Sequence, residues 1–144
     1  MNNVTNAKSL LAITFGQGFI PPNIPIATFK QGDKELNFIL DTGSDNNVVD
    51  KECLESIEHT IDDSQKFNLA GVGTDKNIVQ VCNIPFQYGE DSFTEQFLIS
   101  DLKGPFTLIR KCHAIPLHGM LGSNFLKKQG LILDFKNFTA YSKK

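Results

Sequence analysis

An apolar strand that runs directly into a carboxylate is the feature that most constrains this chain. The apolar residues Phe38–Leu40 precede Asp41, and Thr42 and Gly43 follow it. Three consecutive apolar residues are typical of a buried strand, and Gly43 lets the backbone turn sharply. A carboxylate at the end of such a strand is costly to keep charged unless a neighbouring group donates to it or shares its proton. The pattern therefore indicates a reactive carboxyl group at Asp41, although Asp-Thr-Gly is also a sequence that is common in ordinary turns.

The rest of the chain reads as short β-prone segments separated by turns that contain glycine or proline. Strands are expected at 10–15, 24–30, 35–40, 48–49, 67–70, 78–81, 83–88, 93–100, 131–135 and 138–142. A sustained helical period occurs only at 123–128, where Ser123 suits the N-cap and Gly130 the position past the end. Residues 51–58 favour one or two helical turns, with Asp50 as a possible cap. The pattern predicts a mainly β fold, a small barrel or sandwich with one short C-terminal helix.

A second motif lies near the other end of the chain, where Gly119–Leu126 reads Gly-Met-Leu-Gly-Ser-Asn-Phe-Leu. Together with Asp-Thr-Gly-Ser at 41–44, it resembles the aspartic proteases, in particular their single-domain, retropepsin-like branch. The resemblance covers about residues 24 to 142. It implies a small closed barrel of the acid-protease type at 24–144, preceded by an N-terminal extension at 1–23.

The resemblance also implies an activity, that of an aspartic endopeptidase. Two carboxylates about 3 Å apart cannot both be ionised, so they share one proton, and the pair can then activate water by acid and base catalysis. This chain has one Asp-Thr-Gly, since Asp101 and Asp134 lack the Thr-Gly that would follow. The economical arrangement is a C2 homodimer with Asp41 from each subunit. No cofactor, metal or covalent intermediate is expected, and the partner molecule is a peptide or protein substrate.

Further roles follow from the same resemblance. The catalytic loop would comprise Asp41, Thr42 and Gly43, with Thr42 locking the two loops across the dyad. The substrate-binding residues would be Ser44, Asp45, Gly71, Val72, Gly73 and Met120. Residues 71–73 would form the tip of a flap that closes over the peptide, or else an ordinary hairpin tip. Side-chain pockets are expected from Ile39, Val48, Ile84 and Met120.

The hydroxyl of Ser44 is expected to donate a hydrogen bond to the ionised Asp41, which would favour an acid pH optimum. The sequence departs from the retroviral pattern at Ser123, where those enzymes have an arginine that braces the dimer. The flap segment also has a lower density of glycine, and the residues before Ile24 are more numerous. These departures concern the geometry of the dimer more than the chemistry.

Composition excludes other classes of function. The chain has 144 residues, a formal net charge of −2 and no basic block, so neither nucleic acid nor an anionic membrane is an expected partner. Three widely spaced cysteines indicate reduced thiols, and Leu10–Ile13 is too short for the core of a signal peptide. We therefore expect a cytoplasmic protein. Cys112, His113 and His118 lack the spacing of a zinc site.

Two alternatives to an enzyme remain open from the sequence. A non-catalytic module with the same fold would grip an extended peptide by strand addition, and a structural module would function by dimerisation alone. The intact Asp-Thr-Gly-Ser favours the enzyme, because a protein that only binds has no need of it.

Overall fold

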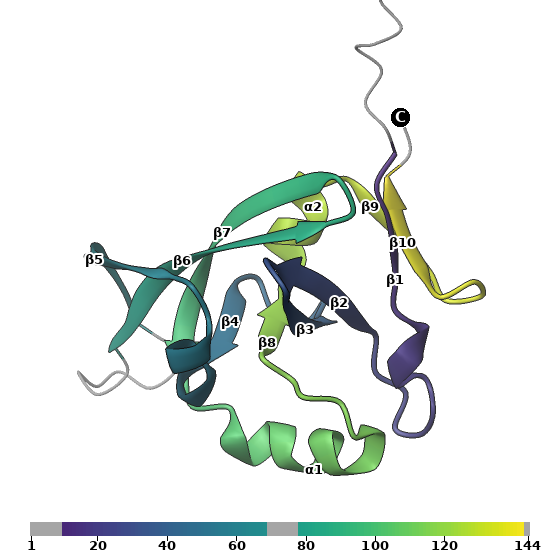
Figure 1. The fold of residues 1–144 in the computed structure, drawn as a ribbon, viewed down its shortest axis with the longest axis horizontal. Coiled ribbons are helices and arrows are strands. Elements are labelled where there is room, and N and C mark those ends of the chain that lie inside the picture. The colour runs from purple at the N-terminus through teal and green to yellow at the C-terminus, as the bar shows by residue number, and fades with distance from the viewer. Residues whose placement is uncertain (1–9, 69–77, 143–144) are drawn as a thin grey trace, which may run out of the picture.

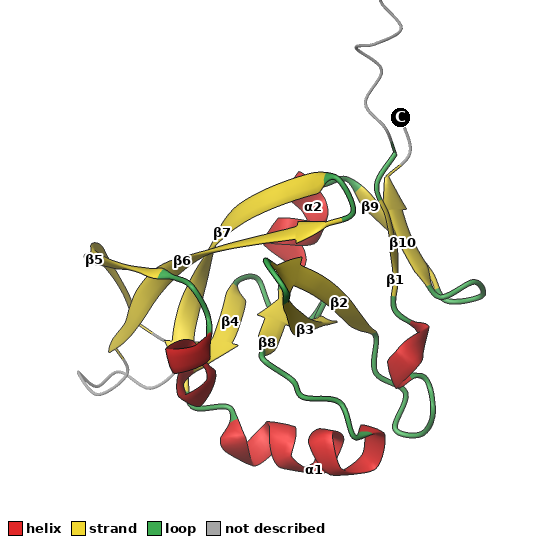
Figure 2. Cartoon of the chain, in the orientation of Figure 1, coloured by secondary structure: helices red, strands yellow, loops and turns green. Residues whose placement is uncertain are grey.

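The strands of the computed structural model, which describes residues 10–68 and 78–142, form a barrel and a smaller sheet beside it (Figure 1). The strands are β1 (Ala12–Thr14), β2 (Ile26–Gln31), β3 (Lys34–Leu40), β4 (Asn47–Asp50), β5 (Thr60–Asn68), β6 (Ile78–Tyr88), β7 (Asp91–Ser100), β8 (Gly119–Leu121), β9 (Leu131–Asp134) and β10 (Thr139–Ser142). The helices are α1 (Lys103–His113) and α2 (Ser123–Lys128), and 3₁₀ turns occupy Gly16–Gly18 and Lys51–Ser56 (Figure 2).

Six strands close the barrel in the order β2-β3-β8-β4-β7-β6, because β2 also pairs with β6 where Lys30 lies opposite Gln87. β5 extends the sheet beyond β6. Two hairpins supply most of the antiparallel pairing, β2–β3 and β6–β7, and each turns at a glycine with positive φ, Gly32 at 63° and Gly89 at 60°. Only glycine adopts this conformation without strain. The predicted mainly β barrel with a short C-terminal helix is confirmed.

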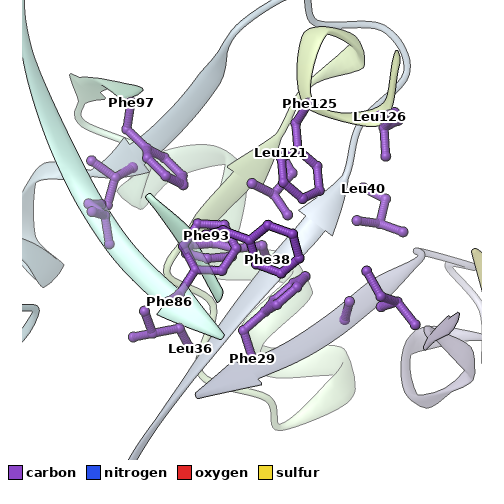
Figure 3. Packing of buried hydrophobic residues seen from close by; sticks show 14 of the residues in the cluster. Phe29, Leu36, Phe38, Leu40, Phe86, Phe93, Phe97, Leu121, Phe125 and Leu126 are labelled. Carbon is purple, nitrogen blue, oxygen red and sulfur yellow. The ribbon is translucent and has the colours of Figure 1, made fainter. Parts of the chain in front are cut away.

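Phenylalanines fill the barrel. Phe29 and Phe38 on the first hairpin contact Phe86, and their ring centroids lie 5.0 and 5.5 Å from that of Phe86. Phe125 on α2 reaches the same cluster and closes one side of it (Figure 3). Burial of each such side chain contributes about 1.5–3 kcal/mol, so this aromatic cluster supplies much of the barrel's stability.

The smaller sheet, in the order β1-β10-β9, joins the two ends of the described chain. β1 confirms the strand expected at 10–15, and β9 with β10 confirms the closing hairpin. Ile13 and Phe15 are fully buried in the same core as the barrel. The carboxylate of Asp134 accepts hydrogen bonds from the backbone of Lys136 and Asn137 and so holds the turn of this hairpin.

The helix α1 was not predicted from the sequence. Its inward-facing side chains, Phe106 and Ile109 among them, follow a helical spacing, but Gly104 and Pro105 in the first turn conceal the period. Proline is tolerated there because its missing N–H would have no helical partner. Figure 2 shows α1 lying along one end of the barrel. Beneath it, a second small core contains Ile26, Ile39, Leu102, Phe106 and Leu117.

One of the two predicted helix caps is at the expected position and the other is not. The helical segment at 51–56 forms as a 3₁₀ turn with Asp50 at its N-cap position, as predicted, although the Asp50 side chain makes no capping hydrogen bond. The carboxylate instead accepts hydrogen bonds from the backbone N–H of Leu102 and from Arg110. The N-cap of α2 is Gly122 rather than Ser123, while Gly130 follows the helix with positive φ as expected.

Candidate active site

The end of β3 places Asp41 beside the end of β8. The two strands run parallel, with Leu40 opposite Leu121, and the N–H of Asp41 donates to the carbonyl of Leu121 at 2.8 Å. β8 also pairs with β4 on its other side, so it lies between the two strands that the Asp41 loop connects (Figure 1). The motif at Gly119–Leu126 therefore supports the loop directly, which explains why the two sequence motifs belong together.

The loop is anchored to the first residues of α2. The backbone N–H of Ser123 donates to the carbonyl of Ser44 at 2.7 Å, and that of Asn124 donates to the carbonyl of Asp45 at 3.0 Å. Gly122 fits closely beneath the loop, since a Cβ there would lie 2.6 Å from the carbonyl oxygens of Ser44 and Asn46. Two hydrogen bonds and a close backbone approach thus fix the loop.

The carboxylate of Asp41 is partly exposed. Its Oδ1 accepts the N–H of Gly43 at 2.9 Å, and within the described residues Oδ2 has no hydrogen-bond partner. One oxygen is thus oriented by the backbone, and the other is available to a water molecule or to a second carboxyl group. Thr42 and Gly43, predicted to act with Asp41, are both exposed at the turn.

An open apolar pocket of about 420 Å³ lies beside Asp41. Its walls come from β3, β8, α1 and the β9–β10 hairpin. The lining residues are Ile24, Pro25, Ile39, Leu40, Asp41, Thr42, Pro105, Phe106, Ile109, Met120, Leu133 and Phe135. Among the described residues of this lining, Asp41 is the only one with an ionisable side chain, so the described part of one chain supplies a single carboxyl group to the pocket.

The other two aspartates considered from the sequence are engaged elsewhere. Asp134 holds the β9–β10 turn, and Oδ1 of Asp101 accepts the N–H of Lys103 at the start of α1. Each carboxylate thus stabilises a local backbone structure rather than facing Asp41 across the pocket.

The predicted pocket residues divide into two groups. Ile39 and Met120 line the pocket, and Val48 packs against the small core behind it. Ile84 is fully buried inside the barrel, so the prediction that it lines a side-chain pocket is wrong. Successive side chains of a strand point to opposite faces of the sheet, and the sequence alone does not show which face of β6 points into the barrel.

The expected hydrogen bond from Ser44 to Asp41 is also wrong. The Ser44 hydroxyl donates to the carbonyl of Asn46 at 2.8 Å, and a hydroxyl has one proton to donate. The side chain of Asp45, two residues past Gly43, lies 3.4 Å from the hydroxyl of Ser123, where the retroviral pattern has an arginine. The candidate flap residues Gly71, Val72 and Gly73 lie outside the described residues.

Asn47 supports the site, although the sequence analysis did not single it out. It is buried, its Oδ1 accepts the N–H of Gly122 at 2.9 Å, and its Nδ2 donates to the carbonyl of Gln96 at 3.0 Å. The sequence feature that could have revealed Asn47 is a side-chain amide at the start of a buried strand, because the polar atoms of a buried amide need hydrogen-bond partners. Asn47 ties the far end of the loop to α2 and β7.

Within residues 10–68 and 78–142, no three histidine, cysteine or acidic side chains gather as they would around a metal ion. The helices described there are also too short and too polar to span a bilayer.

No family model matches the chain, and no curated protein matches it. Among solved structures, the fold is similar to the crystal structure of a retropepsin-like aspartic protease from Rickettsia conorii, with a TM-score of 0.54 and 12% identity over 93% of this chain and 91% of that one. EIAV protease complexed with the inhibitor HBY-793 matches with a TM-score of 0.45 and 21% identity, over 78% of this chain and 93% of that one. The chain has the retropepsin-like fold that its two motifs predicted.

Proposed function

We propose that this protein is an aspartic endopeptidase that acts as a homodimer, with Asp41 of each subunit in one carboxylate pair. The observation that carries the proposal is the setting of Asp41. Its carboxylate lies at the end of a barrel strand, on a loop fixed to α2 and beside an open apolar pocket, and one of its oxygens has no hydrogen-bond partner in the part of the chain that the structure describes. The retropepsin-like fold supports the same reading.

The dimer follows from the need for a second carboxyl group. Asp41 is the only carboxylate that the described residues contribute to the pocket lining, and Asp101 and Asp134 bind backbone N–H groups elsewhere. A two-fold axis beside the exposed loop would bring a second copy of Asp41 to the first. Thr42, exposed next to Asp41, would then bind its counterpart across the axis. Gly43, Ser44 and Asp45 would contact the substrate main chain, and residues 71–73 would close over it.

The paired carboxyl groups would share one proton, because two carboxylates about 3 Å apart repel each other strongly when both are charged. The ionised group takes a proton from a water molecule while the water oxygen attacks the peptide carbonyl carbon. The protonated group gives its proton to the carbonyl oxygen, which forms a tetrahedral diol. A proton then passes to the amide nitrogen as the C–N bond breaks, leaving a carboxylic acid and an amine.

We propose the cytoplasm as its compartment. Cys53, Cys82 and Cys112 all carry free thiols, which is typical of proteins in a reducing environment.

The test is cleavage of an unfolded protein from about pH 3 to 7, the range in which carboxyl pairs titrate. We expect the wild type to cut on the acid side and Asp41→Asn to lose at least about 100-fold in rate, since one member of an acid–base pair is removed. The matched control is Asp33→Asn, an exposed aspartate at the β2–β3 turn, which should cut like the wild type. A statine-type transition-state mimic should inhibit.

Equal cleavage by wild type and Asp41→Asn would exclude the mechanism. Peptide binding without cleavage in either protein would instead favour the non-catalytic binding module.

A further inference from the structure

The helix α1 forms one wall of the pocket beside Asp41. Pro105, Phe106 and Ile109 contribute to the pocket lining, opposite Ile39 and Met120 of the barrel. Phe106 is almost fully buried, and Ile109 is partly buried against the same small core. The width of the pocket therefore depends on where α1 lies relative to β3 and β8.

α1 has few polar attachments to the barrel, and Asp50 at the end of β4 provides two of them. Asp50 is almost fully buried, with 1% of its side chain exposed. Its Oδ1 accepts the N–H of Leu102, the residue that precedes α1, at 3.1 Å. Its Oδ2 accepts from Nη2 of Arg110, on the third turn of α1, at 2.9 Å. One carboxylate on the barrel thus binds the helix at two points along its length.

Arg110 extends this attachment to the segment that follows α1. The same Nη2 donates to the carbonyl of Leu117 at 2.6 Å, just before β8 begins. Its guanidinium also lies 5.4 Å from the ring centroid of Phe106, within the range of a cation–π contact. Arg110 therefore connects the barrel, the chain leading to β8 and a side chain of the pocket wall.

The charge of Asp50 is stabilised in this position. Burial alone would raise the pKa of its carboxyl, but the hydrogen bonds from Arg110 and from the backbone N–H of Leu102, together with the positive charge of Arg110, outweigh burial, so the pKa is lowered. Cys53 and His118 are the other titratable groups close to the pair. The lowered pKa favours the ionised carboxylate of Asp50, the form that pairs with the Arg110 guanidinium.

We propose that Asp50 and Arg110 are positioning residues whose ion pair holds α1 in place, so that the pocket beside Asp41 accepts a large apolar substrate side chain in preference to a small one. This inference rests on the proposed function, because it assigns the pocket to a peptide substrate. Neither residue lines the pocket, so both act through Phe106 and Ile109.

The test compares two peptides that differ only at the residue next to the scissile bond, phenylalanine in one and alanine in the other. The variants are Asp50→Asn with Arg110→Met, which removes both charges together and leaves no buried charge unpaired, and Arg110→Lys. The matched control replaces an exposed pair of similar chemistry, Lys30→Met with Glu35→Gln, on the β2–β3 hairpin. For each folded protein, kcat and KM are measured with both peptides.

We expect the wild type to prefer the phenylalanine peptide in kcat/KM. The double variant should lose about 10-fold of that preference, mainly through a higher KM for the phenylalanine peptide, because a fitted apolar contact is worth about 10-fold or more in discrimination. Arg110→Lys should restore part of the preference, and the control pair should leave it unchanged. A double variant that folds and keeps the full preference would overturn the inference.

A binding measurement separates this inference from the proposed function. The affinity for each peptide is measured in an Asp41→Asn background, with and without the Asp50 and Arg110 changes. One outcome is that the wild type cleaves neither peptide, while the Asp41→Asn protein still binds the phenylalanine peptide more tightly and the added Asp50 and Arg110 changes reduce that preference. In that case the inference holds and the proposed function fails. A protein that binds neither peptide overturns both.

Discussion

His118 directly precedes β8, and the Nδ1 of its imidazole faces the backbone of Asn37 on β3. The N–H of Asn37 donates to Nδ1 at 3.0 Å, so this nitrogen must carry a lone pair rather than a proton. Burial lowers the pKa of His118 below its ordinary 6.5, and the nearby charges of Arg110 and Lys34 act in the same direction, against Asp50. The folded protein therefore binds the neutral ring.

This arrangement predicts a pH-dependent stability. A histidine with a lowered pKa is protonated first in the unfolded chain, so the free energy of unfolding should fall as pH drops below 6.5, by at most about 1.4 kcal/mol per pH unit. His118→Asn keeps an acceptor for the N–H of Asn37 but cannot titrate. The free energy of unfolding of this variant should therefore fall less than that of the wild type as the pH drops. Denaturant unfolding at about pH 7 and 5 measures it.

His59→Asn is the control, because it leaves His118 in place and should keep the decline attributed to His118. An unchanged pH dependence in His118→Asn would show that the imidazole is not held neutral by the fold.

At the scale of elements, the loop that carries Asp41 depends on the close approach of α2. Gly122 lies where a Cβ would meet two backbone carbonyl oxygens at 2.6 Å, a distance that neither can relieve by a side-chain rotation. Its φ is −90°, which other residues adopt, so the requirement for glycine here is steric. Asn47 and the backbone of Ser123 complete the attachment.

Gly122→Ala should destabilise the protein by about 1–3 kcal/mol, as overpacking does, and should reduce cleavage because the Asp41 loop must move. Gly104→Ala is the matched control, since nothing lies within 4 Å of the added methyl group in the first turn of α1. It should leave stability unchanged or raise it by about 0.5–1 kcal/mol. Chemical unfolding of both variants measures the difference, and equal stabilities would contradict the account of Gly122.

Most elements could be predicted because local pattern decides them. The hairpin at 26–40 follows from β-prone residues around Gly32, and α2 follows from its period and from Gly130. α1 was missed because glycine and proline open it and because its inward face includes a polar residue, Arg110. The partner of Arg110 is 60 residues away in sequence, so only the tertiary structure reveals the pair.

Site residues show the same division between local and long-range information. Asp41 and the glycines of its supporting motif could be identified from their order in the chain, and the fold brings the two motifs together. The donor role of Ser44 and the pocket role of Ile84 were wrong because each depends on a side-chain direction. The contribution of Asn47 depends on a contact across 75 residues.

At the scale of the whole molecule, one chain supplies half of the proposed catalytic pair. Its pocket contains the carboxylate of Asp41 and otherwise mostly apolar side chains. A second subunit would complete the pair and explain why a barrel of this size carries only one Asp-Thr-Gly. The proposed activity is therefore a property of the dimer.

The most direct measurement mixes wild-type protein with Asp41→Asn at constant total concentration, under conditions where subunits exchange. If each active site needs Asp41 from both subunits, the cleavage rate falls with the square of the wild-type fraction, to about one quarter in an equal mixture. A mixture with Asp33→Asn controls for dilution and should keep the full rate. A rate that falls in direct proportion, to about one half in the equal mixture, would show that each subunit works with its own Asp41 alone and would contradict the shared pair.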